Sequence, residues 1–345
     1  MRVNWLQAKY YYYDGYGRFG TKLVRQLANL GLDITPMLAD TAHELPGWMQ
    51  RLAGIDYTHL SISLMPPHCM PGLPGRQWGY TMTEAEGLPD GWADHLNDKV
   101  ERVLVPCEWL VDVMKDNGVQ RPVSIVYGGV DAVEFPQLSK PLYTERPYTF
   151  MSLGDRGRRK GHDLVWRAFC KAFTEKDDVR LVQKQRAYDM NKTLIIDNTN
   201  SPDNMTRKVA IWAEDVESMA DVYAHADCFV FPSRGEGWGM PPREAACMGV
   251  PTIVTRWSGL EVGIDHWATR TLDTFTKSKA PTQKDALKGQ WVTADVDELV
   301  EHMRWCYEHR DEAWNKAAEG AAWLRENQSW ELSAKALIDL MERYN

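Results

Sequence analysis

Two glutamates in the second half of the chain are separated by seven residues rich in glycine and proline. Glu236 and Glu244 bracket the residues GWGMPPR, which follow a short apolar run and lead into a helical pattern. Glycine lets a backbone approach a ligand closely, and proline favours the first turn of a helix. Because carboxylates accept paired hydrogen bonds from vicinal hydroxyls, the spacing predicts two carboxylates at opposite ends of one extended polar ligand. The alternative, a turn cap at Glu236 and a solvated Glu244, is disfavoured by the glycines and prolines.

A run of basic residues, DRGRRKG from Asp155 to Gly161, follows the apolar stretch 148–153. Fixed cations stabilise a negative charge that grows on a ligand as a bond breaks. Arginine offers a fork for two phosphate oxygens, whereas Lys160 offers a point charge. The run is therefore suited to a phosphate-bearing ligand, with a solvated basic turn as the alternative for Arg158 and Arg159.

A third pattern lies near the start of the chain, where Gly15, Gly17 and Gly20 spell G-x-G-x-x-G. This fingerprint is typical of dinucleotide sites and makes an NAD(P)-dependent oxidoreductase one alternative function. In a dinucleotide fold the glycines follow the strand in a tight turn, but here eight residues separate Leu6 from Gly15. Asp40, in contrast, stands about where an acid that binds ribose would be, so the oxidoreductase stays an alternative.

The elements that would position these residues are short apolar strands that alternate with helical patterns. Such alternation predicts an α/β protein whose parallel sheets bind ligands beyond the carboxyl ends of the strands. The proline-containing stretch 134–147 is the best linker, so we expect one domain over 1–145 and another over 146–329, with the last helix, 330–345, added to the first. The expected strands are 3–6, 34–38, 60–64, 103–105, 124–126, 148–153, 179–182, 228–231 and 252–255, and the expected helices are 21–30, 108–115, 163–173, 216–225, 242–248 and 298–307.

The composition is that of an ordinary globular protein. The chain has 345 residues, of which 44% are hydrophobic and 26% charged. No apolar run approaches the ~20 residues of a membrane span, and no secretory signal is visible. Six scattered cysteines without a C-x-x-C pair argue against zinc sites and disulfides and for a reducing compartment. We therefore expect a cytoplasmic protein, with attachment to a membrane surface left open. The net charge of −8 disfavours bulk binding to nucleic acid.

Several segments together resemble the retaining, nucleotide-sugar-dependent glycosyltransferases of family 4, which have the GT-B fold. The span from Glu236 to Glu244 is similar to their E-x7-E signature. Further segments of this chain also resemble that family. They are VLVPCEWLVDVMKDNGV and VSIVYGGVDAVEF within 103–135, MSLGDRGRRKGHDLVWRAF at 151–169, MADVYAHADCFVFPS at 219–233 and SW at 329–330. The resemblance implies two Rossmann-like domains that face across a cleft, the first on the acceptor side and the second binding the donor. It also implies a C-terminal helix that crosses back to the first domain.

The resemblance further implies which residues hold the donor. Glu244 should bind the ribose of the nucleotide, and Glu236 should hold the transferred sugar. The backbone beside Glu236 belongs to the same donor-binding set, which adds Gly237, Trp238, Gly239 and Met240. Lys160 and one arginine should neutralise the diphosphate; we assign Arg156, with Arg158 and Arg159 as alternatives because the loop is one residue shorter than is usual in the family.

On the acceptor side, the resemblance places the first Gly-rich segment against the donor phosphates and the acceptor. Gly15 and Gly17 are therefore candidate diphosphate contacts, and Tyr10–Tyr13 either lines the acceptor side or covers the first sheet. The family often has a histidine near the reactive carbon of the sugar, where this chain has Glu84. Glu84 is thus a candidate general base or a ligand for an acceptor hydroxyl. The nearby His59 and His68 are expected to be structural.

The predicted function is that of a hexosyltransferase that moves a sugar from a UDP- or GDP-sugar to an acceptor hydroxyl with retention of the anomeric configuration. The leaving phosphate would help to deprotonate the acceptor. We expect no metal and no cofactor, since Lys and Arg supply positive charge and Asp295-Val-Asp297 suits a helix cap.

The acceptor class stays open among saccharides, lipid-linked molecules, small molecules and proteins, with modified DNA disfavoured by the acidic charge. Besides the oxidoreductase, a catalytically silent nucleotide-sugar-binding protein is an alternative. The intact Glu236, Glu244 and Lys160 argue against such a silent protein.

Overall fold

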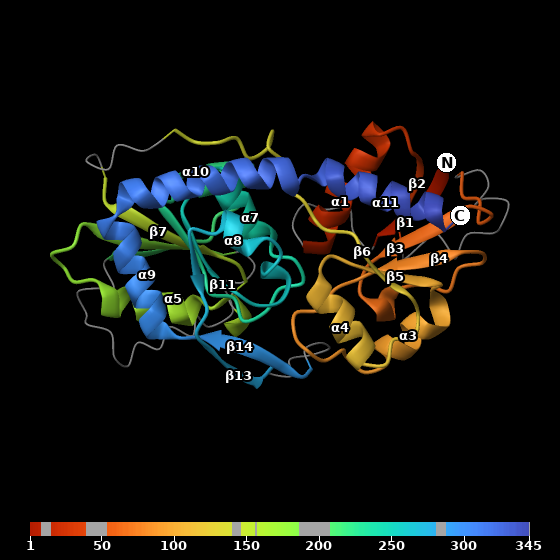
Figure 1. The fold of residues 1–345 in the computed structure, drawn as a ribbon, viewed down its shortest axis with the longest axis horizontal. Helices are drawn as coiled ribbons and strands as arrows, with labels where there is room; N and C mark the ends of the chain where they lie inside the picture. Colours follow the sequence, from red (N-terminus) through yellow and green to blue (C-terminus); the bar gives the residue numbers. More distant parts are fainter. Residues whose placement is uncertain are drawn as a thin grey trace. The chain divides into compact units, whose positions relative to one another are not determined.

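The computed structural model describes residues 1–7, 15–38, 54–139, 146–155, 157–185, 208–280 and 288–344, and these form two compact units. Unit 1 comprises Met1–Gly129, Lys279–Gln290 and Gln328–Asn345, and unit 2 comprises Val130–Ser278 and Trp291–Asn327. Each unit contains a six-stranded sheet with helices against it (Figure 1).

The sheet of unit 1 has the order β2-β1-β3-β4-β5-β6, and every neighbouring pair of strands is parallel. Parallel sheets are covered on both faces, which explains why β1, β3, β4 and β5 are buried along nearly their whole length. The strands are β1 (Arg2–Gln7), β2 (Asp33–Leu38), β3 (Leu60–Leu64), β4 (Gln77–Tyr80), β5 (Arg102–Val105) and β6 (Val123–Ile125), and the helices are α1 (Gly15–Asn29), α3 (Trp92–Lys99), α4 (Glu108–Asp116) and α11 (Trp330–Arg343).

The last helix of the chain belongs to unit 1 and packs against α1. Ser329 caps it by accepting the N–H of Leu332. The Phe19 ring of α1 meets the Trp330 ring edge-on, with the ring centroids 4.8 Å apart. Gly129 lies so close that a Cβ there would be 2.3 Å from the nitrogen of Trp330. The predicted return of the C-terminal helix to the first part of the chain is therefore confirmed.

Helix α1 begins earlier than the sequence predicts. The helix was expected from residue 21, but it starts at Gly15, so the glycines of the first Gly-rich segment lie in its first turns rather than in a loop. A Cβ on Gly20 would lie 2.1 Å from Oε1 of Gln7 in β1, and Nε2 of Gln7 donates to the carbonyl of Gly17 at 3.0 Å. Close packing of α1 on the sheet thus accounts for Gly20.

The sheet of unit 2 has the order β12-β11-β10-β7-β8-β9 and is also parallel throughout. A separate two-stranded sheet pairs β13 (Phe275–Lys279) with β14 (Gln290–Ala294). The strands of the main sheet are β7 (Tyr148–Leu153), β8 (Val179–Lys184), β9 (Val209–Trp212), β10 (Cys228–Phe231), β11 (Thr252–Thr255) and β12 (Arg270–Leu272), and the helices are α5 (His162–Ala172), α6 (Met219–Ala224), α7 (Met240–Cys247), α8 (Ile264–Trp267), α9 (Val296–Glu308) and α10 (Arg310–Asn327).

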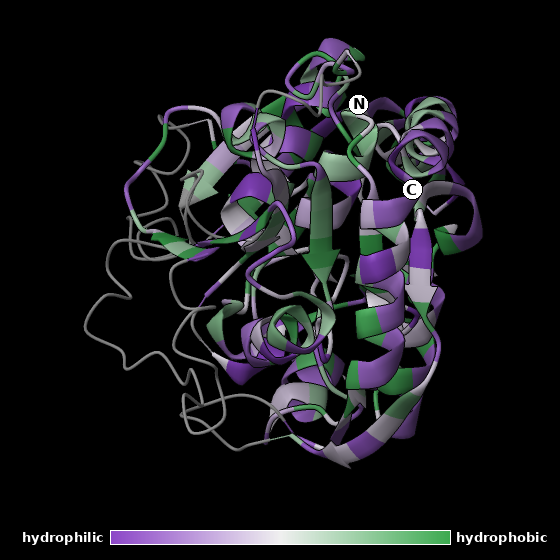
Figure 2. Cartoon of the chain, turned by 90° about the vertical axis from the view of Figure 1, so that its left-hand side faces the viewer, coloured by the Kyte–Doolittle hydropathy of each residue, from purple (hydrophilic) through white to green (hydrophobic). Residues whose placement is uncertain are grey.

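The core of unit 2 consists of two apolar clusters on opposite faces of its sheet. Side chains alternate between the faces of a strand, so Val230 of β10 joins one cluster while Phe229 and Phe231 join the other. The first cluster contains residues of α5 and α9, and the second contains residues of α7, α8 and α10. In Figure 2 a hydrophobic strand, drawn green, lies among helices that are banded green and purple.

The α/β class and the two parallel sheets match the prediction, and most of the expected strands lie within a residue or two of their places. The longest helix, α10, was not predicted, and neither were β4, β9, β12 and α3. None of the helices in the described part of the chain has both the length and the apolar character that a membrane span requires.

Candidate functional site

The candidate donor site of unit 2 is formed by loops that leave neighbouring strands at the same edge of the sheet. Strands β7 and β10 are parallel neighbours, so the loops that follow them emerge side by side. The loop after β7 contains the 3₁₀ turn Arg158–Lys160, and the loop after β10 leads into α7. The two loops touch, because a Cβ on Gly161 would lie 2.2 Å from the carbonyl oxygen of Pro232.

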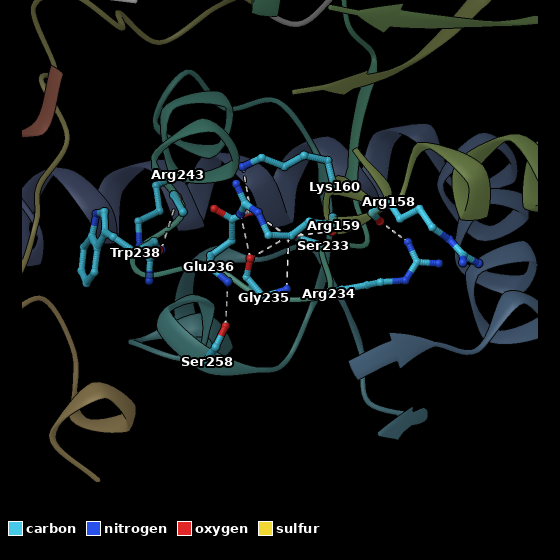
Figure 3. Close-up of polar contacts among 11 residues, drawn as sticks. Arg158, Arg159, Lys160, Ser233, Arg234, Gly235, Glu236, Trp238, Arg243 and Ser258 are labelled. Atoms are coloured by element: carbon cyan, nitrogen blue, oxygen red, sulfur yellow. Dashed lines mark hydrogen bonds and ion pairs between the residues drawn. The ribbon is translucent and has the colours of Figure 1, made fainter. Parts of the chain in front are cut away.

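Three side chains converge on one carboxylate oxygen of Glu236 (Figure 3). Nη1 of Arg159 and Nζ of Lys160 each lie 2.8 Å from Oε1, and Oγ of Ser233 donates to the same atom at 2.7 Å. Glu236 is only 6% exposed. The structure therefore brings the predicted Glu236 and Lys160 into direct contact.

The charges of this cluster are strongly coupled. Burial raises the pKa of Glu236, but Arg159, Lys160 and Ser233 outweigh it and lower the pKa to about 2. Burial and the charge of Arg159 lower the pKa of Lys160 overall, although the charge and the hydrogen bond of Glu236 act in the opposite direction. Glu236 is therefore ionised at neutral pH and accepts hydrogen bonds without donating any. Two cations against one carboxylate leave these three side chains with a net positive charge, which favours an anionic ligand.

A third loop, after β11, fixes the backbone on both sides of Glu236. The N–H of Glu236 donates to Oγ of Ser258 at 3.0 Å, and its carbonyl accepts from the N–H of Gly259 at 3.0 Å. Ser258 has a φ of 60°, which makes it the one non-glycine residue with positive φ in the described part of the chain. A Cβ on Gly259 would lie 2.2 Å from the carbonyl oxygen of Gly237. The sequence analysis did not single out Ser258 or Gly259, since they come 22 residues or more after Glu236.

Glu244 lies in α7 and is buried rather than solvated, being 5% exposed. The hydroxyl of Tyr223 in α6 donates to its Oε2 at 2.8 Å. Gly239, the N-cap of α7, has a φ of 82°, a backbone conformation that favours glycine. The adjacent Trp238 is also buried. The carboxylate of Glu244 is thus oriented by a tyrosine that the sequence analysis missed.

Two buried arginines beside this site were also missed, because each looks like an ordinary polar residue in the sequence. Arg234 forms a two-point ion pair with Asp163, with N–O distances of 2.9 and 2.8 Å. Burial raises the pKa of Asp163, but the hydrogen bond and charge of Arg234 lower it overall. Arg243 is 0% exposed and lies within α7. Neither arginine could be recognised from spacing, since Asp163 lies 71 residues from Arg234 and the partners of Arg243 are backbone carbonyls.

The three arginines proposed for the diphosphate differ in position. Arg159 contacts both Glu236 and the carbonyl of Gly235, at 2.9 Å. The side chain of Arg158 is exposed, while its backbone carbonyl accepts from Arg234. Arg156 lies outside the described residues. Of the two described candidates for the diphosphate, Arg158 and Arg159, it is therefore Arg159 whose side chain contacts Glu236.

The candidate residues of unit 1 gather near one end of its sheet. Tyr16, between Gly15 and Gly17, donates its hydroxyl to the carbonyl of Met82 at 2.8 Å and accepts the N–H of Met82 at 3.1 Å. Burial raises the pKa of Tyr16, and the charge of Glu84 adds to the rise. Tyr16 thus ties the start of α1 to Met82, two residues before the half-buried Glu84. Tyr10–Tyr13 and Asp40 lie outside the described residues.

Two of the minor predictions concern histidines and a helix cap. Nδ1 of His68 accepts from the indole N–H of Trp92 at 3.1 Å, which supports a structural role. Nε2 of His59 lies 3.7 Å from Oδ2 of Asp56. Asp295 accepts the N–H groups of Asp297 and Glu298 at the start of α9, so its predicted role as a cap is confirmed. Within the described ranges, His, Cys, Asp and Glu side chains form no group that could hold a metal ion.

Comparison with known proteins gives one family match. A family model described as "Family 4 Glycosyltransferase in conflict systems" matches residues 107–337, which is more than half of the chain. The "Serotype-specific mannosyltransferase WbdA" of Escherichia coli is 30% identical over 110 residues. That stretch spans 31% of this chain and 13% of the mannosyltransferase.

Solved structures of similar shape cover the whole chain. A sucrose-phosphate synthase from Thermosynechococcus elongatus has a TM-score of 0.73 at 13% identity, covering 100% of this chain and 99% of its own. Anabaena Alr3699/HepE in complex with UDP-glucose has a TM-score of 0.71 at 10% identity, covering 99% of this chain and 100% of its own. These matches show that the chain has the GT-B fold.

Proposed function

Because the chain belongs to family 4 of the glycosyltransferases, we propose that Glu236, Glu244 and Lys160 hold a UDP- or GDP-sugar. The family makes the protein an enzyme that transfers a sugar from a nucleotide sugar. In our proposal the sugar passes to an acceptor hydroxyl with retention of configuration. An oxidoreductase built on the first Gly-rich segment is set aside, since the family match points to glycosyl transfer.

The observation that carries the proposal is the convergence of Arg159, Lys160 and Ser233 on Glu236, at 2.7–2.8 Å. The ionised Glu236 can accept hydrogen bonds from two sugar hydroxyls. The positive charge left over beside it is suited to the diphosphate, whose negative charge grows as the sugar leaves. We propose that Arg159 and Lys160 bind the diphosphate, with Arg156 as a further contributor.

Glu244 is proposed to bind the ribose of the nucleotide. A carboxylate can accept from both hydroxyls of a vicinal diol, and the hydroxyl of Tyr223 holds this one in a single orientation. A fixed acceptor loses less entropy on binding than a mobile one, which favours the bound nucleotide. We propose UDP or GDP as the nucleotide of the donor and a hexose as its sugar. The similar HepE structure contains UDP-glucose, while the relative in Escherichia coli is a mannosyltransferase.

Unit 1 is proposed to supply the acceptor side. Gly15 and Gly17 would approach the diphosphate, and Glu84 would bind the acceptor hydroxyl or take its proton. Accordingly, we assign residues 1–145 and 330–345 to the acceptor-side domain and 146–329 to the donor-binding domain. The acceptor is a hydroxyl on a saccharide, a lipid-linked molecule, a small molecule or a protein, and the net charge of −8 disfavours DNA.

No residue of the chain needs to form a covalent bond with the sugar in this mechanism. A leaving phosphate oxygen accepts the proton of the incoming hydroxyl on the same face of the sugar, so the anomeric configuration is retained. Lys160 and Arg159 stabilise the diphosphate charge as the glycosidic bond breaks, and Glu236 keeps the sugar in place. Holding both reactants in a reactive geometry can lower the barrier by about 7–11 kcal/mol in favourable cases.

The test combines binding with turnover. Melting temperature is measured with UDP-glucose, GDP-mannose, their parent diphosphates and NADH, since a ligand of the folded state raises it. Release of UDP or GDP is then followed with a panel of hydroxyl acceptors. We expect one nucleotide sugar to stabilise the wild type and to be consumed, and Glu244→Gln to abolish most of both effects.

Glu319→Gln, an exposed position of α10, serves as the matched control and should behave as wild type. Stabilisation by NADH alone, or a Glu244→Gln protein that binds and turns over normally, contradicts the proposed function. Binding of a nucleotide sugar without release of its diphosphate would instead favour a silent binding protein.

A further inference from the structure

Arg243 is a completely buried cation beside the candidate donor site. It lies in α7, immediately before Glu244, and is 0% exposed. Its guanidinium group lies 3.9 Å from the centroid of the Trp238 ring and 4.9 Å from that of the Trp267 ring. Figure 3 shows the side chain next to Trp238, joined to the backbone there by a dashed line.

The guanidinium group donates to four backbone carbonyls on two loops. Nη1 donates to the carbonyls of Trp238 and Gly239, the latter at 3.3 Å. Nη2 donates to the carbonyls of Gly259 and Val262, at 2.9 and 3.1 Å. Arg243 therefore ties the loop that contains Glu236 to the loop whose Ser258 accepts the N–H of Glu236.

The prolines of α7 make the first two of these contacts important. The first four N–H groups of a helix have no acceptor within the helix. In α7 those positions are Gly239, Met240, Pro241 and Pro242, and proline has no N–H. Only Gly239 and Met240 can thus donate from this end of the helix.

Arg243 donates to the carbonyls of the same two peptide groups whose N–H groups belong to Gly239 and Met240. In a trans peptide the C=O and N–H point in opposite directions. The carbonyl of Trp238 shares its peptide with the N–H of Gly239, and the carbonyl of Gly239 shares its peptide with the N–H of Met240. Since Arg243 holds both carbonyls, it fixes the direction of both N–H groups, away from the guanidinium.

We infer that Arg243 is a positioning residue of the donor site, which aims the N–H groups of Gly239 and Met240 at hydroxyls of the transferred sugar. The inference rests on the proposed function, in which this backbone lies beside the sugar that Glu236 holds. A cation bound to a carbonyl also polarises the peptide and makes its N–H a stronger donor. Arg243 acts through these peptides and does not itself touch the donor.

Lysine cannot replace arginine in this role. The four carbonyls need a planar fork with several donors in fixed directions, and the two indole rings need a flat cation to stack on. An ammonium group has three donors and cannot stack in the same way. Arg243→Lys therefore retains the positive charge while it releases some of the carbonyls.

The test compares the affinity of the whole donor with that of its nucleotide part. Calorimetry gives Kd for UDP and UDP-glucose, and for GDP and GDP-mannose, in the wild type and in Arg243→Lys. We expect the variant to bind UDP or GDP within about threefold of wild type but the matching nucleotide sugar roughly tenfold or more weakly. The donor KM should rise by a similar factor.

Arg325→Lys is the matched control, because Arg325 donates to the carbonyl of Cys247 at 2.8 Å, at the opposite end of the same helix. It should leave the ratio of the two Kd values unchanged. Equal weakening of diphosphate and nucleotide sugar by Arg243→Lys, or no change in either, overturns the inference.

A measurement on the wild type keeps the inference testable if Arg243→Lys does not fold. Amide hydrogen exchange at Gly239 and Met240 should slow when UDP-glucose or GDP-mannose binds, and much less with UDP or GDP. Equal protection by both ligands, or none, tells against Arg243 as a positioning residue. A wild type that binds none of the four ligands would instead remove the proposed function.

Discussion

Nζ of Lys160 lies 2.8 Å from Oε1 of Glu236, in a site where both side chains are largely buried. Each group stabilises the charged form of the other, so neither can be replaced without changing the electrostatics of its partner. In the proposed mechanism the two residues bind different parts of the donor: Glu236 holds the sugar, and Lys160 holds the leaving diphosphate.

The first prediction concerns stability at acid pH. The pKa of Glu236 is lowered from an ordinary value of 4.5 to about 2. A carboxyl group with a lowered pKa in the folded state stabilises the protein above its unfolded pKa and loses that contribution as pH falls. The wild type should therefore lose stability more steeply than Glu236→Gln between pH 4.5 and about 2.

Urea unfolding at a series of pH values measures this difference. Glu319→Gln, an exposed substitution, should run parallel to the wild type over the whole range. A Glu236→Gln curve parallel to the wild type would mean that the carboxylate is not held by its cations.

The second prediction concerns the charge on the basic loop. Lys160→Ala should lower kcat by roughly 10²–10³-fold, which is typical for removal of one donor that stabilises a developing anion. Arg158→Ala, two positions away and exposed, should change kcat by less than about threefold. Initial rates of diphosphate release measure both variants, and equal losses would point to a nonspecific effect of charge.

The third prediction concerns the tyrosine that orients Glu244. Tyr223→Phe removes the hydrogen bond to Oε2. A hydrogen bond to a charged group contributes about 1.5–3 kcal/mol, so the donor KM should rise about tenfold or more with a smaller change in kcat. Tyr148→Phe is the control, because the hydroxyl of Tyr148 donates to a backbone carbonyl of Asp227 instead. A fall in kcat with an unchanged KM would contradict the role given to Tyr223.

The fourth prediction separates strain from hydrogen bonding at Ser258. Its φ of 60° costs a non-glycine residue about 1–2 kcal/mol, and its hydroxyl accepts the N–H of Glu236. Ser258→Ala keeps the strain and loses the acceptor, whereas Ser258→Gly loses both. The alanine variant should be the less stable of the two in urea unfolding, while both should lose activity. Higher stability of the alanine variant would contradict this account.

The fifth prediction separates packing from ligand binding among the first glycines. Gly20→Ala should destabilise the protein, since the new Cβ would lie 2.1 Å from Oε1 of Gln7 and 2.7 Å from a methyl of Leu64. Gly15→Ala meets no atom within 4 Å, so its melting temperature should stay near that of the wild type. If Gly15 approaches the diphosphate as proposed, Gly15→Ala should nevertheless raise the donor KM. An unchanged donor KM would contradict the proposed approach of Gly15 to the diphosphate.

The sequence predicted those residues of the candidate site that are close together in the chain. Glu236 and Glu244 could be identified because the glycines between them allow a ligand to approach the backbone and the prolines mark the start of a helix. The alternation of strands and helices likewise predicted two parallel sheets, because buried parallel strands are continuous apolar runs.

Contacts between distant segments could not be predicted in this way. Ser258 reaches Glu236 from the loop after the next strand, and Tyr223 reaches Glu244 from the helix before β10. Arg243 looks like a solvated residue in the sequence, because its four acceptors are backbone carbonyls, which every residue type has. The helix start at Gly15 was missed because glycine lowers helix propensity, while close packing on β1 favours it there.

Helix α10 belongs to unit 2 and the following helix α11 to unit 1, which affects the order in which the two units can fold during synthesis. Unit 2 ends at Asn327, whereas unit 1 needs α11, which follows directly and covers Phe19 with Trp330. During synthesis, all residues of unit 2 are therefore made before unit 1 receives α11. A premature stop codon after residue 327 would thus leave unit 2 whole and deprive unit 1 of the helix that covers Phe19.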